Sequence, residues 1–180
     1  EITSATAFTV TLSSADLFAV RGLLNKDGTA SDGNTTYNLA AADNWMTAAA
    51  TSTDIADTSS NAITVSNVSD PTITSATYNA SSGALVVTGT NFVSENGGTN
   101  DVDPTKMTIT GEASGTRVLT TSAVEITSAT EFTITLNSAD KTAVDLLLNK
   151  AGTLSNDNKT YNLAAAEDWM AGAAASAAAL

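Results

Sequence analysis

The sequence contains no cysteine and no histidine among its 180 residues. Without cysteine, the chain can form neither a disulfide framework nor a thiolate metal site. Without histidine, it lacks the commonest general base, the commonest transition-metal ligand and the usual partner of a serine or cysteine nucleophile. The sequence also has no nucleophile elbow, phosphate-binding loop or paired-acid motif. We therefore expect a protein that is not an enzyme.

Charge of either sign is scarce, and positive charge is scarcest. Charged residues make up 14% of the chain, and 7 Lys and Arg stand against 19 Asp and Glu, for a net charge of −12. Typical globular proteins have about 25% charged residues. So few cations argue against nucleic acid and anionic membrane surfaces as partners, whereas the carboxylates permit divalent cations. No apolar run approaches the roughly 20 residues that span a bilayer, so we expect no membrane insertion.

What the sequence does contain is a long internal repeat. Residues 1–6 (EITSAT) return as residues 125–130, an offset of 124 residues. The similarity continues without a gap to residues 46 and 170, and about 32 of these 46 aligned positions are identical. We call residues 1–46 the first repeat and residues 125–170 the second repeat. A period of this length corresponds to a whole domain, which predicts a tandem array of similar modules.

The ends of the chain are out of phase with this predicted module. Val68-Ser69-Asp70-Pro71 separates a β-like run at 62–68 from a new alternating pattern. We interpret residues 1–70 as the C-terminal part of one module and residues 71–180 as most of the following module, without its own copy of the final strand. We thus expect a segment of a longer secreted chain.

The β-like run at 62–68 is the predicted inter-module strand. Its candidate contact residues are Ile63, Val65 and Val68. An incomplete sheet exposes an edge that accepts a strand from a neighbour, and head-to-tail donation generates an open filament.

Alternation of apolar and polar residues predicts further strands at 72–78, 84–92, 106–110, 116–121, 125–127 and 131–136, the last recurring at 7–12. The period then changes: Ser138 and Asp140 favour a helix start, Gly152 lies just past its end, and the first repeat shows the same pattern. Second short helices are predicted at 163–170 and 39–46. We expect a mainly β protein, with Ig-like antiparallel β-sandwich modules in tandem, each with one or two short inserted helices.

Residues 85–92, LVVTGTNF, resemble the apolar-x-Gly-x-x-Phe strand of bacterial Ig-like modules, especially the IPT/TIG type. The LLNK-x-G and YNLAAA-x-x-W segments are similar to long repeats of large secreted surface proteins of Gram-negative bacteria, including adhesins. The resemblance implies an extracellular, cell-surface location and a structural role. It carries over no catalytic residues.

One acidic loop is a candidate calcium site. Glu95, Asn100, Asp101 and Asp103 offer oxygen ligands on a glycine-containing loop, although the spacing is not that of an EF-hand. The alternative interpretation is a solvated loop whose Asp and Asn side chains form local turns. Both interpretations stay open at this point.

The two tryptophans also have two interpretations. Trp45 and Trp169 could each form an aromatic platform for sugars or anchor a core, and the core is favoured because aromatics are only 5% of the chain. The first functional hypothesis is therefore a structural repeat that builds a stalk, surface layer, sheath or self-assembling filament, with copies of itself as partners. The alternative is a calcium-dependent adhesion module that binds glycans or another surface.

Overall fold

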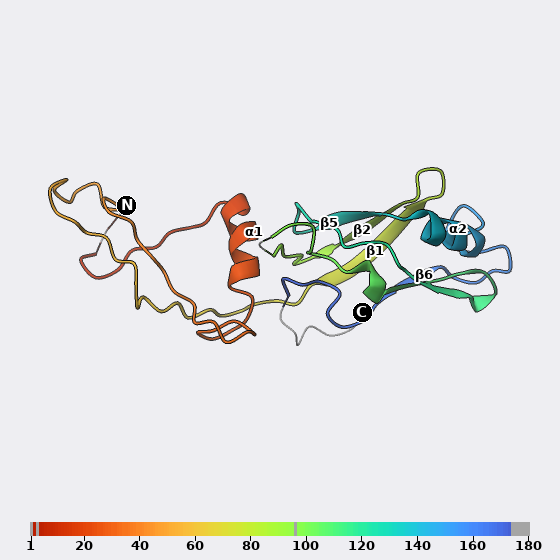
Figure 1. Ribbon diagram of the computed structural model, residues 1–180, viewed down its shortest axis with the longest axis horizontal. Helices are drawn as coiled ribbons and strands as arrows, with labels where there is room; N and C mark the ends of the chain where they lie inside the picture. The colour runs from red at the N-terminus through yellow and green to blue at the C-terminus, as the bar shows by residue number, and fades with distance from the viewer. Residues whose placement is uncertain (1, 3, 96, 174–180) are drawn as a thin grey trace.

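The computed structural model describes residues 2, 4–95 and 97–173. Figure 1 shows an elongated arrangement, in which most of residues 1–70 lie at one end and the strands lie at the other. Within the described residues, no helix is both long and apolar enough to cross a membrane.

The first sheet has three antiparallel strands in the order β1-β2-β5. They are β1 (Thr72–Asn79), β2 (Ala84–Thr90) and β5 (Glu131–Thr135). The turn between β1 and β2 is fixed by the Asn79 side chain, which accepts hydrogen bonds from two following backbone amides, and by Gly83 at φ +75°. Asn and Gly favour such turns because they tolerate these local conformations.

The second sheet is also antiparallel, with the order β4-β3-β6. It contains β3 (Met107–Thr110), β4 (Thr116–Val118) and β6 (Asn162–Ala165). Short 3-10 helices precede and follow β3, at η1 (Pro104–Lys106) and η2 (Glu112–Ser114). The prediction of a mainly β protein is confirmed at this level: the described residues form two small antiparallel sheets and two α-helices.

One core joins the two sheets. Alternate residues of β2 and β5 are buried, as the period of two in a half-buried strand requires. Phe92 and Phe132 pack with ring centroids 5.1 Å apart, and Trp169 lies 5.8 Å from Phe92 at nearly a right angle. The second sheet contributes its own buried side chains, Met107 and Ile109.

The two helices begin alike because their sequences begin alike. Helix α1 (Ser14–Leu23) is capped by Ser13, whose hydroxyl accepts from the Asp16 amide, and α2 (Ser138–Leu147) is capped by Asn137 in the same way. A side-chain oxygen at this position satisfies an amide that has no partner within the helix. The predicted helix at 138 and its counterpart in the first repeat are both confirmed.

The predicted second helices are wrong. Residues 162–165 form β6, which pairs with β3, and residues 39–46 are not helical. Alanine-rich segments have high helix propensity, but pairing with a neighbouring strand overrides that weak local preference. The predicted strand at 125–127 is likewise absent, and the nearest pairing is an isolated bridge between Val102 and Val124.

The two equivalent strand segments differ in the structure. Residues 131–135 form β5, paired along β2, whereas residues 7–12 form no strand. Among the described residues, no strand lies beside residues 7–12 in the way that β2 lies beside β5. The local sequence is nearly the same, so the difference comes from the missing pairing partner.

Helix α1 contacts the loop that follows β2. A Cβ atom at Gly22 would overlap the carbonyl oxygen of Ser94, so this approach requires glycine. Phe18, one turn earlier, packs against the main core. The position equivalent to Gly22 in α2 is Leu146, which is 71% exposed.

Candidate functional site

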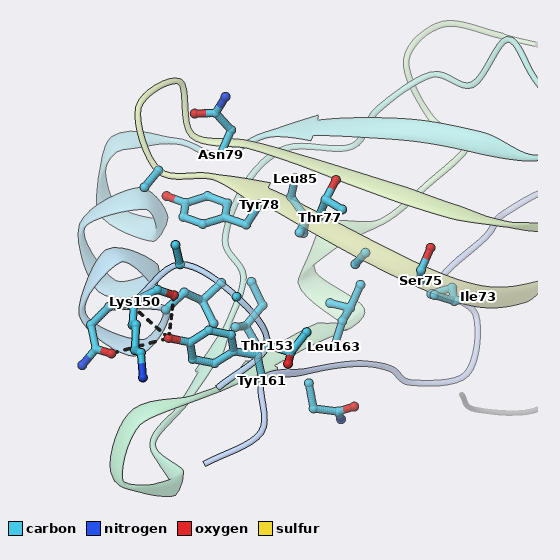
Figure 2. A pocket seen from close by; sticks show the side chains of 18 of the residues that line it. Ile73, Ser75, Thr77, Tyr78, Asn79, Leu85, Lys150, Thr153, Tyr161 and Leu163 are labelled. Atoms are coloured by element: carbon cyan, nitrogen blue, oxygen red, sulfur yellow. Dashed lines mark hydrogen bonds between the residues drawn. The ribbon is translucent and has the colours of Figure 1, made fainter. Parts of the chain in front are cut away.

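A groove of about 1020 Å³ lies between the edges of β1 and β6. Its apolar lining comes from both sheets and from the segment after α2. Figure 2 shows Tyr78 and Leu85 on one side, Tyr161 and Leu163 on the other, and Ile73 further along β1. The groove therefore lies between two sheet edges, β1 and β6, that do not pair with each other.

At one end of the groove, Tyr161 holds the chain in a fixed turn. Its hydroxyl accepts a hydrogen bond from the Lys150 amide at 3.1 Å and donates to the Lys150 carbonyl at 3.1 Å (Figure 2). The Asn149 side-chain oxygen lies 3.5 Å from the same hydroxyl. These contacts position Gly152, which has φ +115°, on the groove wall.

Tyr78 closes the side of the groove near α2. Its hydroxyl donates to Asp145 at 2.7 Å, and the ammonium of Lys141 donates to the other oxygen of Asp145 at 2.7 Å. The Lys141 hydrogen bond, with that of Tyr78, lowers the pKa of Asp145. Burial and the Asp145 hydrogen bond raise the pKa of Tyr78. The first repeat has Leu17 and Arg21 at the positions of Lys141 and Asp145, so this contact belongs to the second repeat only.

The groove-side edge of β6 has backbone groups that do not face β3. All four residues of β6 are in register with β3, and the Ala166 amide donates to the Lys106 carbonyl at 2.9 Å, so Asn162 and Ala164, at the same parity as Ala166, direct their peptide groups to β3. In an antiparallel pair, alternate residues direct their peptide groups to opposite edges. The amides of Leu163 and Ala165 and the carbonyl of Tyr161 therefore point away from β3.

The first repeat has the same local frame, and there the equivalent edge is paired. Tyr37 donates its amide to Thr29 at 2.9 Å, just as Tyr161 donates to Thr153 at 3.0 Å. Gly28 has φ +112° and exchanges two backbone hydrogen bonds with Val65, at 3.0 and 2.8 Å.

The predicted strand residues lie along this first-repeat edge. The Ile63 amide donates to Tyr37 at 3.2 Å, and the Leu39 amide donates to Asn61 at 2.9 Å. Ile63 and Val65 are half-buried on one face, whereas Val68 is exposed. Each pairing is an isolated bridge rather than a continuous ladder.

A second surface is formed by apolar side chains of the first repeat. Phe8 is 50% exposed and its counterpart Phe132 is 4% exposed, while Trp45 is 43% exposed and Trp169 is 2% exposed. Phe8 and Trp45 stack on each other with centroids 5.7 Å apart. The same contrast holds for Ile2, Val10 and Leu12 against Ile126, Ile134 and Leu136. We call Ile2, Phe8, Val10, Leu12 and Trp45 the exposed apolar face.

A buried carboxylate shows the same contrast between the repeats. Asp140 is fully buried and accepts hydrogen bonds from Arg117 (2.6 and 2.9 Å), the Thr120 amide (2.7 Å) and the Thr121 hydroxyl (2.7 Å). Burial alone would raise the pKa of Asp140, but these hydrogen bonds outweigh it and lower the pKa to about 2. Its counterpart Asp16 is exposed and accepts from its own cap residue, Ser13.

The acidic side chains among the predicted calcium ligands are used in other contacts. Both oxygens of the buried Asp101 accept backbone amides, from Glu95 at 2.6 Å and Ile126 at 2.8 Å. Asp103 caps η1 through the amide and hydroxyl of Thr105. Over residues 2, 4–95 and 97–173, no group of three or more acidic side chains is placed to hold a metal ion.

Two further contacts concern the same loop. Glu95 accepts from the Asn100 side chain at 3.3 Å, and the Asn100 side-chain oxygen is buried without a hydrogen-bond partner. Asp101 thus ties the loop to the backbone at Ile126 and is not part of a solvated loop, and calcium binding stays a prediction.

The two tryptophans are placed differently. Trp169 is a core residue between Phe92 and Phe132, which confirms the core interpretation for this residue. Trp45 remains accessible, and its indole NH donates to the Ile55 carbonyl at 3.0 Å.

Sequence reasoning did not identify the groove, because its lining comes from five separate segments. The available signal was the repeat itself, which aligns Tyr161 with Tyr37 and Gly152 with Gly28. No protein-family model, curated protein or solved structure matches the chain.

Proposed function

We propose that this chain belongs to a structural array of tandem Ig-like β-sandwich modules in a secreted bacterial surface protein. The array builds a stalk, layer, sheath or filament, and its partners are further copies of the same module. The proposal is supported above all by the exposed apolar face, because the same positions are buried in the second repeat.

In the second repeat, these positions are covered by residues 71–124. Phe132 lies in β5, which pairs with β2, and Trp169 contacts Phe92 just after β2. The first repeat has nearly the same sequence, so its apolar face fits a segment like residues 71–124. Covering each large apolar side chain stabilises a protein by about 1.5–3 kcal/mol, which is a strong drive toward such a neighbour.

A fusion tests this proposal directly. A second copy of residues 71–124 is joined to the N-terminal side of residue 1, so that the first repeat follows the segment that precedes the second repeat. We expect Trp45 to become buried, with a blue-shifted emission and weaker quenching by acrylamide. A matched fusion with Phe8→Asp keeps the length but removes the core contact, and it should leave Trp45 accessible.

The same experiment separates the array from a glycan-binding module. If Trp45 is a core residue that a segment like residues 71–124 covers, the fusion buries it. If Trp45 remains as accessible in the fusion as in the original chain, the array proposal is wrong and an aromatic binding platform becomes the better explanation.

A further inference from the structure

We infer that the groove between β1 and β6 is an acceptor site for residues 61–68 of a second copy of this chain. The inference rests on the proposed function, because it names how neighbouring copies contact each other. The template is within the molecule itself, where residues 61–65 already pair with the equivalent segment of the first repeat.

The acceptor backbone is already in the required conformation. Gly28 and Gly152 have φ +112° and +115°, and Tyr37 and Tyr161 form the same amide hydrogen bond. In the first repeat the Gly28, Tyr37 and Leu39 backbone groups bind residues 61–65.

Their equivalents in the second repeat are available on the groove side. Gly152, Tyr161 and Leu163 line the groove, and the register of β6 turns the Leu163 amide and the Tyr161 carbonyl away from β3. The hydrogen-bond donors and acceptors of the incoming strand thus meet matching groups.

The side chains of residues 61–68 suit the groove. Ile63 and Val65 lie on one face and are half-buried, so in the acceptor they enter between Ile73, Leu85 and Leu163. Residues 61–68 contain no charged side chain, so no ion is desolvated when they enter.

The burial of the two tyrosines agrees with this assignment. Tyr37, beside the paired strand, is 5% exposed, whereas Tyr161 is only half-buried. Residues 61–65 are bound to the first repeat of their own chain, so donation to a second copy is an exchange, in which they leave Gly28, Tyr37 and Leu39 for the equivalent groups of the groove. Repeated head-to-tail, this contact is heterologous, and it builds an open filament when its rotation does not close a ring.

The pairing predicts a specific crosslink. In the first repeat, Asn38 and Ala62 are opposite each other without sharing hydrogen bonds, and both side chains are exposed. Such pairs have Cα atoms about 4.5 Å apart, within the range that a disulfide spans. Asn162 is equivalent to Asn38, so Asn162→Cys on one chain should react with Ala62→Cys on another. The native chain has no cysteine to interfere.

The two single variants are mixed, one of them isotopically labelled, and oxidised with a glutathione buffer. We expect the mixed disulfide in roughly tenfold excess over a control that pairs Asn162→Cys with Thr64→Cys, which is out of register. A synthetic peptide of residues 57–68 should suppress the product. Equal yields from Ala62→Cys and Thr64→Cys would overturn the inference.

This test is independent of the fusion described above. The fusion reports on Phe8 and Trp45, neither of which lines the groove or belongs to the donated segment. A buried Trp45 together with equal crosslinking yields would leave the structural array intact and remove only strand exchange through this groove.

Discussion

Replacing Asp140 with Asn tests whether the ion pair between Asp140 and Arg117 stabilises the second repeat. Asp140 is fully buried, and its carboxylate accepts from Arg117, Thr120 and Thr121. An amide in its place provides one acceptor oxygen instead of two and leaves the Arg117 charge without its partner. Removing one member of such a network costs more than the pair contributes, because the remaining group stays desolvated.

The magnitude follows from the pKa. The hydrogen bonds lower the pKa of Asp140 from 3.8 to about 2. A difference of this size corresponds to about 2 kcal/mol of stability that depends on the charge. Because the pKa is lower in the folded state, this stability is fully present above about pH 4. It is lost as the pH falls toward 2, where the folded protein also becomes protonated.

The assay is urea unfolding followed by circular dichroism at several pH values, with Asp16→Asn as the matched control. Asp140→Asn should lose about 2–3 kcal/mol at pH 7 and much less near pH 2. Asp16→Asn has the same helix position without the buried network, so it should change stability by less than about 0.5 kcal/mol. A loss for Asp140→Asn that is the same at both pH values would refute the electrostatic explanation.

Two further predictions use the same contrast between buried and exposed groups. Phe132→Ala should cost about 3–5 kcal/mol in thermal unfolding, whereas Phe8→Ala should cost less than about 1 kcal/mol; similar losses would contradict the difference in burial. Asp101→Asn should lower stability by about 1–3 kcal/mol equally with and without calcium, because its oxygens accept backbone amides. A loss of stability that appeared only in the presence of calcium would contradict this prediction. A calorimetric titration with calcium would then test Asp101 as a ligand.

Among the described residues, the sequence located β1, β2, β3, β4 and β5 by alternation, and it located both helices by their cap residues. It could not predict that residues 7–12 form no strand, because that depends on a neighbour and not on local pattern. It also assigned a helix to residues 163–170, although residues 162–165 form β6, since alanine and leucine have helical propensity and the pairing with β3 is non-local.

For the candidate site, the sequence supplied the donor but not the acceptor. Ile63 and Val65 were recognisable from their alternation. The groove is formed by β1, β6 and the segment after α2, which no local pattern brings together. The acidic loop was recognisable as a set of oxygen ligands, but the burial of Asp101 against Ile126 depends on a contact 25 residues away.

The contact between Gly22 and Ser94 has a consequence for the order of neighbours. Only glycine admits the Ser94 carbonyl at that point of α1, and the equivalent position of α2 is occupied by Leu146. The two repeats are therefore not interchangeable at this position, because the first repeat approaches the Ser94 carbonyl only where a side chain is absent. A leucine at this position would overlap the Ser94 carbonyl, so a repeat that carries leucine there cannot pack against a loop like the one after β2 in the same way.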